Sequence, residues 1–187
     1  MKKIFVVAFV LLLGFALTGC EENKTHHAEI VVKDMGTIAV ELDGRTAPIS
    51  VNNFIKLAKS GFYDGTTFHR IIENFMIQGG APNTDIKASS LKTIKGEFSA
   101  NGVNNTISHK RGVISMARAT NYNSGSSQFF IMHKDTLSLD GQYAAFGHVT
   151  SGMEIVDEIA TKTPTEDSNG TVLEENRPII ETVKVIN

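Results

Sequence analysis

The chain has 187 residues, 41% of them hydrophobic, which is enough for one domain with a sizeable core. Its net charge of -2 provides no basic field for nucleic acid, so we expect no nucleic-acid partner. The single cysteine, Cys20, excludes an intramolecular disulfide and a cysteine-rich zinc site. We see no internal repeat, second domain or coiled coil in the sequence, and we expect a monomer.

The N-terminal segment has the pattern of an export signal. Lys2-Lys3 precede an apolar run, Ile4 to Leu17, which is shorter than the about 20 residues that a membrane-spanning helix requires. The run ends in Leu17-Thr18-Gly19-Cys20, which resembles a bacterial lipobox. We therefore predict that residues 1–19 are a lipoprotein signal peptide and that lipidated Cys20 anchors the protein to a membrane of the cell envelope, facing outside the cytoplasm. An ordinary signal peptide with a chance cysteine is the alternative.

Residues 20–28 continue as a polar segment, which we interpret as a tether between the lipid anchor and a domain covering residues 29–187. Two adjacent histidines, His26 and His27, lie in this segment. We interpret them as solvated side chains, because two histidines in a mobile tether would bind a metal only weakly.

The remaining elements follow in chain order. Apolar and polar residues alternate on both sides of Asp34-Met35-Gly36, as in a β-hairpin. Pro48 begins a segment of helical periodicity that ends at Gly61, and a second such segment begins at Met153. The segment 81–111 is polar and predicts a surface excursion with a short strand near Glu97-Phe98. Further strands are predicted over residues 66–72, 75–78, 112–117, 128–132, 146–149 and 179–185.

Many short strands with two helices, and no regular alternation of strand and helix, predict a mainly β protein. We expect an antiparallel β-barrel capped by helices.

Two blocks, residues 68–80 and 127–130, contain the main candidate functional residues. They combine the guanidinium of Arg70 with apolar side chains and two neutral amides: Phe75, Met76, Phe130, Gln78 and Gln128. This set has no carboxylate pair, activated nucleophile or metal cluster. It suits a reaction in which a bond is twisted and nothing is transferred.

Other chemistries fit less well. The serine-rich loop 124–127 lacks the Gly-x-Ser-x-Gly turn of a hydrolase nucleophile, and strand alternation places His69 and Arg70 on opposite faces. Gly79-Gly80 is not followed by the Lys-Ser/Thr of a phosphate loop, and the histidines have no metal-ligand spacing. A structural ion pair remains an alternative role for Arg70. Periodicity also leaves open whether the adjacent Phe75 and Met76 line one pocket.

Four blocks resemble the cyclophilin family of peptidyl-prolyl isomerases: Phe68 to Gly80, Gly112 to Ala117, Gly125 to Ile131 and Leu139 to Gly147. The likeness runs from about Glu29 to the C-terminus. It implies a closed eight-stranded antiparallel β-barrel with a helix over each end, and an isomerase that requires no cofactor or metal. The positions that match the family's active site are Arg70, Phe75, Met76, Gln78, Ala117, Gln128, Phe130 and Leu139.

By this resemblance, Arg70, Phe75 and Gln78 take catalytic roles, and the substrate-binding residues are Met76, Ala117, Gln128, Phe130, Leu139 and Tyr143. The implied partners are proline-containing polypeptides, and the implied role is to assist the folding of exported proteins. The alternative is a binding module or chaperone that holds proline-containing segments in the same groove without turnover.

Three positions depart from the family pattern. Tyr143 falls where many members have His, and it keeps an aromatic wall. Arg118 stands where Asn is usual, and activity is kept if the substrate contacts only its backbone. Ser138 replaces a Trp that contributes to cyclosporin contact in several members.

Overall fold

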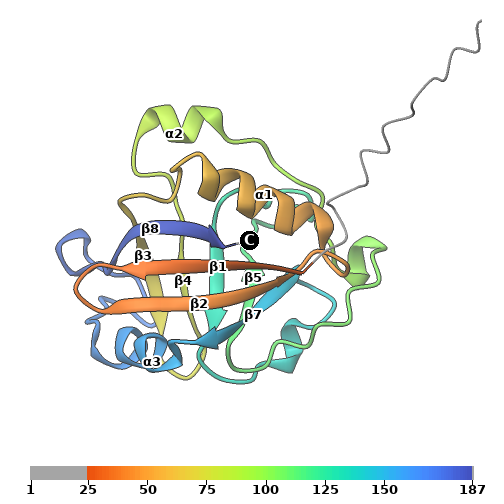
Figure 1. The fold of residues 1–187 in the computed structure, drawn as a ribbon. Helices are drawn as coiled ribbons and strands as arrows, with labels where there is room; N and C mark the ends of the chain where they lie inside the picture. Colours follow the sequence, from red (N-terminus) through yellow and green to blue (C-terminus); the bar gives the residue numbers. More distant parts are fainter. Residues whose placement is uncertain (1–24, 187) are drawn as a thin grey trace, which may run out of the picture.

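The computed structural model describes residues 25–186, which form one closed β-barrel with the strand order β1-β2-β7-β5-β6-β4-β3-β8. Every pair of neighbouring strands is antiparallel (Figure 1), which confirms the predicted barrel. The strands are β1 (Thr25–Val32), β2 (Gly36–Asp43), β3 (Thr66–Ile72), β4 (Met76–Gly79), β5 (Val113–Met116), β6 (Phe129–Met132), β7 (Ala145–Ser151) and β8 (Ile179–Ile186).

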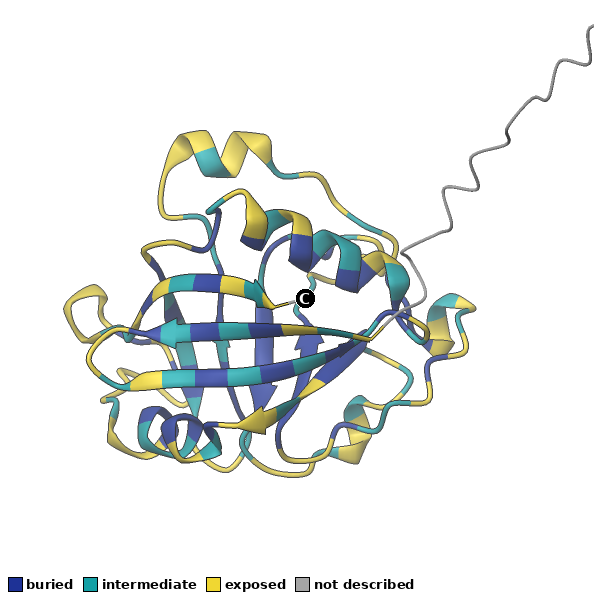
Figure 2. Ribbon diagram, in the orientation of Figure 1, coloured by how far each residue is buried: buried dark blue, intermediate teal, exposed yellow. Residues whose placement is uncertain are grey.

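The first hairpin follows the predicted alternation. Ile30 of β1 lies opposite Ile38 of β2, and both are fully buried. Buried and less buried residues alternate along these two strands in Figure 2, as expected for strands with one face toward the core. Asp34, with a φ of 60°, and Gly36, with a φ of 123°, occupy the turn, where their residue types tolerate positive φ.

The structure corrects the C-terminal boundary of the predicted tether. Residues 25–28 belong to β1, because Thr25 pairs with Asp43 and Ala28 pairs with Val40 of β2. Backbone hydrogen bonds form the ladder whatever the polarity of the side chains, and Ala28, only 1% exposed, fills an inward position. Polar composition alone therefore placed the start of the domain too late. Cys20 and the predicted signal peptide, residues 1–19, lie outside the described residues.

The two helices that periodicity predicted are α1 (Pro48–Lys59) and α3 (Met153–Lys162). They lie on opposite sides of the barrel in Figure 1, as the family resemblance implied. Pro48 begins α1, where its missing N–H is not needed. Each helix turns an apolar face to the strands, through Phe54 and Ile55 in α1 and through Val156 and Ile159 in α3. Among residues 25–186, no helix is long and apolar enough to span a membrane.

The excursion 81–111 differs from its prediction. It contains a short helix, α2 (Asp85–Ser90), and residues 97–98 form no strand. Instead, the buried carboxylate of Glu97 accepts hydrogen bonds from Ile49 N (2.9 Å), Ser50 N (2.7 Å) and Ser50 Oγ (2.7 Å). An anion at this position satisfies free N–H groups at the start of α1, which has no capping side chain of its own.

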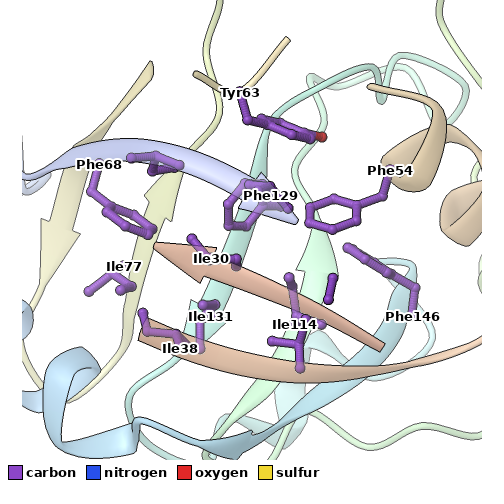
Figure 3. Packing of buried hydrophobic residues seen from close by; sticks show 14 of the residues in the cluster. Ile30, Ile38, Phe54, Tyr63, Phe68, Ile77, Ile114, Phe129, Ile131 and Phe146 are labelled. Atoms are coloured by element: carbon purple, nitrogen blue, oxygen red, sulfur yellow. The ribbon is translucent and has the colours of Figure 1, made fainter. Parts of the chain in front are cut away.

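Aromatic rings fill the barrel interior (Figure 3). Phe129 of β6 packs edge-on against Phe54, Tyr63 and Phe68, with ring centroids 5.5, 5.7 and 6.1 Å apart. All four side chains are completely buried. The interior is therefore a packed core, and a substrate must bind outside it.

Candidate active site

A pocket of about 200 Å³ opens on the outer surface of the barrel beside β4, β5 and β6. Its lining contains eight of the nine predicted site residues together with Arg118: Arg70, Phe75, Met76, Gln78, Ala117, Phe130, Leu139 and Tyr143. The ninth, Gln128, lines an adjoining pocket that shares Gln78 with the first. The structure thus brings the predicted set together, and the roles of its members in catalysis remain predictions.

Strand register aligns the centre of the pocket. Arg70 of β3 lies opposite Gln78 of β4, and Gln78 lies opposite Phe130 of β6. Directly opposite residues share a face of an antiparallel sheet. A guanidinium, an amide and an aromatic ring therefore form a row across three strands.

A β-bulge in β3 overturns the predicted alternation of His69 and Arg70. The register shifts between Phe68 and Arg70, and the two core residues Phe68 and Ile71 are separated by two residues that are only partly buried. His69 and Arg70 thus both fall outside the core between two inward-facing residues. A bulge inserts one extra residue and re-aims its neighbours, which a period of two cannot anticipate.

Neutral groups hold the Arg70 side chain. Its Nε donates to Asn169 O (2.8 Å) and its Nη1 donates to Gln78 Oε1 (3.3 Å). Gln78 Nε2 in turn donates to Gln128 Oε1 (2.9 Å), so the two amides fix each other's orientation. Within residues 25–186, no carboxylate lies at ion-pair distance from Arg70, so the alternative of a structural ion pair finds no partner here.

Phe130 and Met76 provide an apolar surface beside this charge. Their exposed fractions are 5% and 1%, and they belong to a second hydrophobic cluster, separate from the core inside the barrel. Tyr143 packs edge-on against Phe130 with ring centroids 5.7 Å apart. The pocket therefore offers a small apolar surface next to a cation that has no carboxylate partner among residues 25–186.

Phe75 reaches the pocket from a turn. The predicted strand from Phe75 begins one residue later, at Met76, and Phe75 N closes the preceding turn on Ile72 O (3.0 Å). Phe75 is therefore not bound by the alternation that governs Met76 and Gln78. This explains how two adjacent residues line one pocket, the question that periodicity left open.

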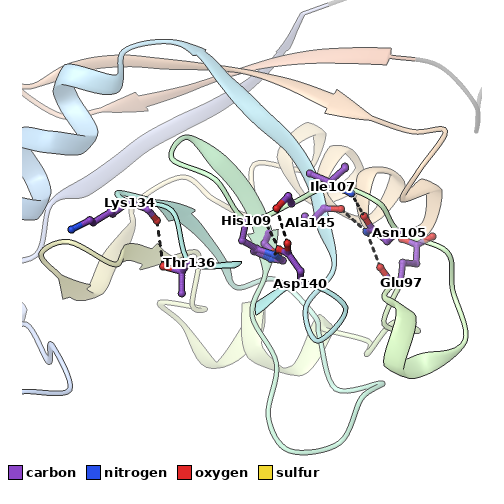
Figure 4. A network of polar contacts seen from close by, with 10 residues as sticks. Glu97, Asn105, Ile107, His109, Lys134, Thr136, Asp140 and Ala145 are labelled. Atoms are coloured by element: carbon purple, nitrogen blue, oxygen red, sulfur yellow. Dashed lines mark hydrogen bonds and ion pairs between the residues drawn. The ribbon is translucent and has the colours of Figure 1, made fainter. Parts of the chain in front are cut away.

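A buried histidine supports Phe130 from outside the pocket lining. The His109 ring stacks on Phe130 (6.0 Å between centroids, 19° between planes), and Figure 4 shows its contact with Asp140. His109 Nδ1 lies 2.9 Å from Asp140 Oδ1, and Nε2 lies 3.1 Å from Ser115 Oγ. This resembles a nucleophilic triad only in its residue types, because His109 and Ser115 are both 0% exposed. Burial lowers the pKa of His109, although the contacts with Asp140 oppose that shift.

Arg118 is a pocket residue whose side chain the sequence reasoning left out. Its guanidinium lies 4.7 Å from the centroid of Tyr143 and 4.9 Å from that of Tyr122. It also donates from Nε to Gln142 O (3.0 Å) and from Nη1 to Ala119 O (2.9 Å). These contacts hold the Tyr143 wall. The contacts with Gln142 and Tyr143 join residues that are distant in sequence from Arg118, so no local pattern indicated them.

Metal chemistry has no ligand set in the part of the chain that the structure describes. No group of three or more His, Cys, Asp or Glu side chains is placed there to hold an ion. The pocket and its neighbour offer two guanidinium groups, Arg70 and Arg118, two amides and apolar surface.

Comparisons with known proteins agree with this arrangement. Residues 27–185 match the family model described as cyclophilin type peptidyl-prolyl cis-trans isomerase/CLD. Peptidyl-prolyl cis-trans isomerase A of Dickeya dadantii is 40% identical over 160 residues, covering 83% of this chain and 81% of its own. Peptidyl-prolyl cis-trans isomerase B of Bacillus subtilis is 41% identical over 147 residues, covering 79% of this chain and 94% of its own.

A solved structure extends the agreement to the fold. The crystal structure of a Cryptosporidium parvum cyclophilin type isomerase has a TM-score of 0.72 and 26% identity, covering 88% of this chain and 99% of its own. A second structure of that protein was determined in the presence of the dipeptide Ala-Pro, and it matches with a TM-score of 0.71 and 27% identity over 86% of this chain and 99% of its own. With a barrel, a pocket and a family match that coincide, this chain belongs to the cyclophilin-type peptidyl-prolyl cis-trans isomerases.

Proposed function

We propose that this isomerase twists X-Pro amides with the help of Arg70, with no covalent intermediate, and that its substrates are exported proteins. An X-Pro bond must cross a barrier because the amide nitrogen shares its lone pair with the carbonyl, and uncatalysed isomerisation takes tens to hundreds of seconds. In the twisted state the lone pair is localised on nitrogen and can accept a hydrogen bond. A donor aimed at that nitrogen therefore stabilises the transition state more than the ground state.

The observation that carries this mechanism is the setting of Arg70. Its two hydrogen bonds go to neutral oxygens and use two of the five N–H donors of a guanidinium. The charge has no carboxylate partner among residues 25–186 and stands beside the apolar pocket surface. A hydrogen bond from a charged donor is stronger where water is excluded, so this position suits a transient acceptor.

The remaining pocket residues divide the work of holding the substrate. Phe75, Met76, Phe130 and Leu139 offer a dry surface of a size suited to a proline ring. Gln78, held by Gln128, and the backbone near Ala117 would hold the flanking peptide, so that one side of the amide rotates against the other. The use of Ala-Pro with the Cryptosporidium parvum relative supports proline-containing segments as substrates.

The proposed location rests on the N-terminal sequence. Lys2-Lys3, the apolar run and Gly19-Cys20 together favour export and lipidation. An isomerase tethered outside the cytoplasm would meet proteins that emerge unfolded across the membrane. X-Pro isomerisation is slow enough to limit their folding.

The mechanism is tested by separating binding from turnover. NMR exchange spectroscopy on an X-Pro peptide measures cis/trans interconversion directly, and we expect fast exchange that a metal chelator does not alter. Arg70→Ala is expected to keep peptide affinity while exchange slows, because the lost interaction forms only in the transition state. Equal exchange rates for the two proteins would rule out the Arg70-assisted twist. Sensitivity to the chelator would point to a metal instead.

A further inference from the structure

The turn that carries Phe75 is fastened to the end of β6 chiefly by His133, with a longer hydrogen bond from Lys134 N to Phe75 O (3.4 Å). Asn74 N donates to His133 Nδ1 (2.9 Å), and His133 N donates to Phe75 O (2.9 Å). These two bonds hold the backbone on both sides of the Asn74-Phe75 peptide. They extend the pairing of β4 with β6 one residue beyond Met76 and Met132.

The turn needs such a hold because Asn74 has a φ of 60°. This conformation is uncommon for a residue other than glycine, although Asn tolerates it better than most. A turn that holds a residue other than glycine at positive φ can change its backbone conformation unless its neighbours fix it. Any such change would move the side chain of Phe75, which lines the pocket.

The ring of His133 can accept the Asn74 N–H in one neutral tautomer only. Because Nδ1 accepts the Asn74 N–H, the proton of the neutral ring must lie on Nε2. Nε2 lies 3.3 Å from Asp157 Oδ1 on α3, so the carboxylate faces the nitrogen that must carry the proton. The His133 side chain is only 10% exposed, which limits the access of water to these bonds.

Asp157 is itself held in place. Arg111 binds it through two bonds, Nη1 to Oδ1 (2.6 Å) and Nη2 to Oδ2 (2.8 Å), and Arg111 Nη1 also donates to His133 O (2.9 Å). The hydrogen bond from Arg111 keeps the pKa of Asp157 below its ordinary value. The chain of contacts thus runs from Arg111 through Asp157 and His133 to the turn.

We propose that His133 is a positioning residue for prolyl isomerisation: it holds the 73–75 turn so that Phe75 stays in the pocket wall, and Asp157 selects the tautomer that can do so. The inference rests on the proposed function of the pocket, since it gives His133 a role only through Phe75. A merely structural histidine in the same place would contribute to stability and leave the rate of the folded enzyme unchanged.

Two substitutions of His133 test the roles of its two ring nitrogens separately. His133→Asn places an amide oxygen close to the position of Nδ1, where it can still accept the Asn74 N–H. His133→Gln reaches toward Asp157 but leaves Asn74 without an acceptor, and His133→Ala serves as a second removal variant. One neutral hydrogen bond corresponds to roughly a 2- to 13-fold effect, so we expect kcat/KM to fall by roughly 3- to 10-fold in the Gln and Ala variants. The Asn variant is expected to stay within about twofold of the wild type, by the same reasoning.

A double-mutant cycle with Phe75→Ala supplies the decisive readout, with thermal unfolding measured alongside. If His133 acts through Phe75, His133→Gln lowers kcat/KM in the wild type and has no further effect in Phe75→Ala. Additive losses in the cycle, or equal losses in the Asn and Gln variants, would overturn the inference and leave the proposed function intact. Full activity of Phe75→Ala would overturn both, because the pocket assignment itself would then be wrong.

Discussion

Strand β6 presents two adjacent phenylalanines to two different environments. Phe129 points into the barrel, where it meets three other buried rings, and Phe130 forms part of the pocket on the outside. Both are almost completely buried, at 0% and 5% exposure. The same residue type thus serves stability on one face of the strand and substrate contact on the other. Burial alone therefore does not tell the two roles apart.

The largest effect is expected from Phe129→Ala. Removing a buried aromatic ring from a packed core costs about 3–5 kcal/mol, a large part of the 5–15 kcal/mol typical of a whole domain. Urea denaturation is expected to show this loss, while the folded fraction keeps its isomerase rate. Phe130→Ala is the matched control, and it should lower the rate more than the stability. If Phe129→Ala lowered mainly the rate and Phe130→Ala mainly the stability, the assignment of one face to stability and the other to substrate contact would be wrong.

Arg70→Ala tests whether the guanidinium on the outer face of the barrel contributes to the isomerisation rate. A hydrogen bond to a charged group is worth about 1.5–3 kcal/mol, so we expect the rate to fall by roughly 10- to 150-fold. Arg70→Lys is expected to restore only part of the rate, because an ammonium lacks the planar fork of donors. Denaturation curves should change little. Unfolding of Arg70→Ala would instead mean that the arginine is part of the structural framework.

The buried His109, which stacks on Phe130, predicts a pH effect on stability. Because burial lowers its pKa in the folded protein, the unfolded chain takes up a proton first as the pH falls below about 6.5. Stability from this group is therefore present above about pH 6.5 and is lost on acidification, by at most about 1.36 kcal/mol per pH unit. His109→Gln should reduce the slope of unfolding free energy against pH. His69, whose pKa burial also lowers, contributes with the same sign and should keep part of the slope.

A smaller effect is expected from Arg118→Leu, which leaves the Tyr143 wall without its cation. Stacking of a guanidinium on an aromatic ring is worth about 0.5–1 kcal/mol at a partly exposed site, or roughly a two- to fivefold change. We expect this change to appear as a higher KM for proline peptides, with kcat nearly unchanged, because Tyr143 contacts the substrate and the transition state alike. A drop in kcat alone would mean that Arg118 stabilises the transition state instead of supporting substrate binding.

No effect on the rate is expected from Cys20→Ser, because Cys20 precedes the first strand of the barrel. The variant should move the protein from the membrane fraction to a soluble or secreted pool, or block signal cleavage. Mass spectrometry of the mature N-terminus measures this directly. An unmodified Cys20, or cleavage elsewhere, would reduce the segment to an ordinary signal peptide.

Sequence periodicity predicted the first hairpin well because β1 and β2 each have one buried face, whereas β5 and β6 are buried at every position and were recognised as short apolar runs. It did worse where a single residue breaks the pattern. The bulge at His69 and the start of β1 at Thr25 depend on pairing with other strands, which no local window contains. Likewise Glu97 caps a helix that begins 49 positions before it in the chain, so its isolated sequence context predicted a strand instead.

The pocket residues were found by resemblance rather than by periodicity. Phe75 lies in a turn and Met76 in a strand, so only the three-dimensional structure could place both side chains at one pocket. The neighbours that hold the lining are harder still to foresee. Arg118 and His133 act through backbone carbonyls, rings and turns that are distant in sequence, and their residue types carry no signal of that use.

The closing seam of the barrel has a consequence for how the protein is made. Strand β8, the last element described, fills the gap between β1 and β3, pairing His27 with Ile186 on one side and Thr66 with Ile180 on the other. Because synthesis runs from the amino terminus, one edge of β1 and one edge of β3 stay unpaired until β8 has been made. Such edges are prone to pair with other chains, and contacts between distant residues form slowly. We therefore expect the barrel to close late, after β8 has been made, so that an enzyme for slow amide isomerisation has a slow closing step in its own folding.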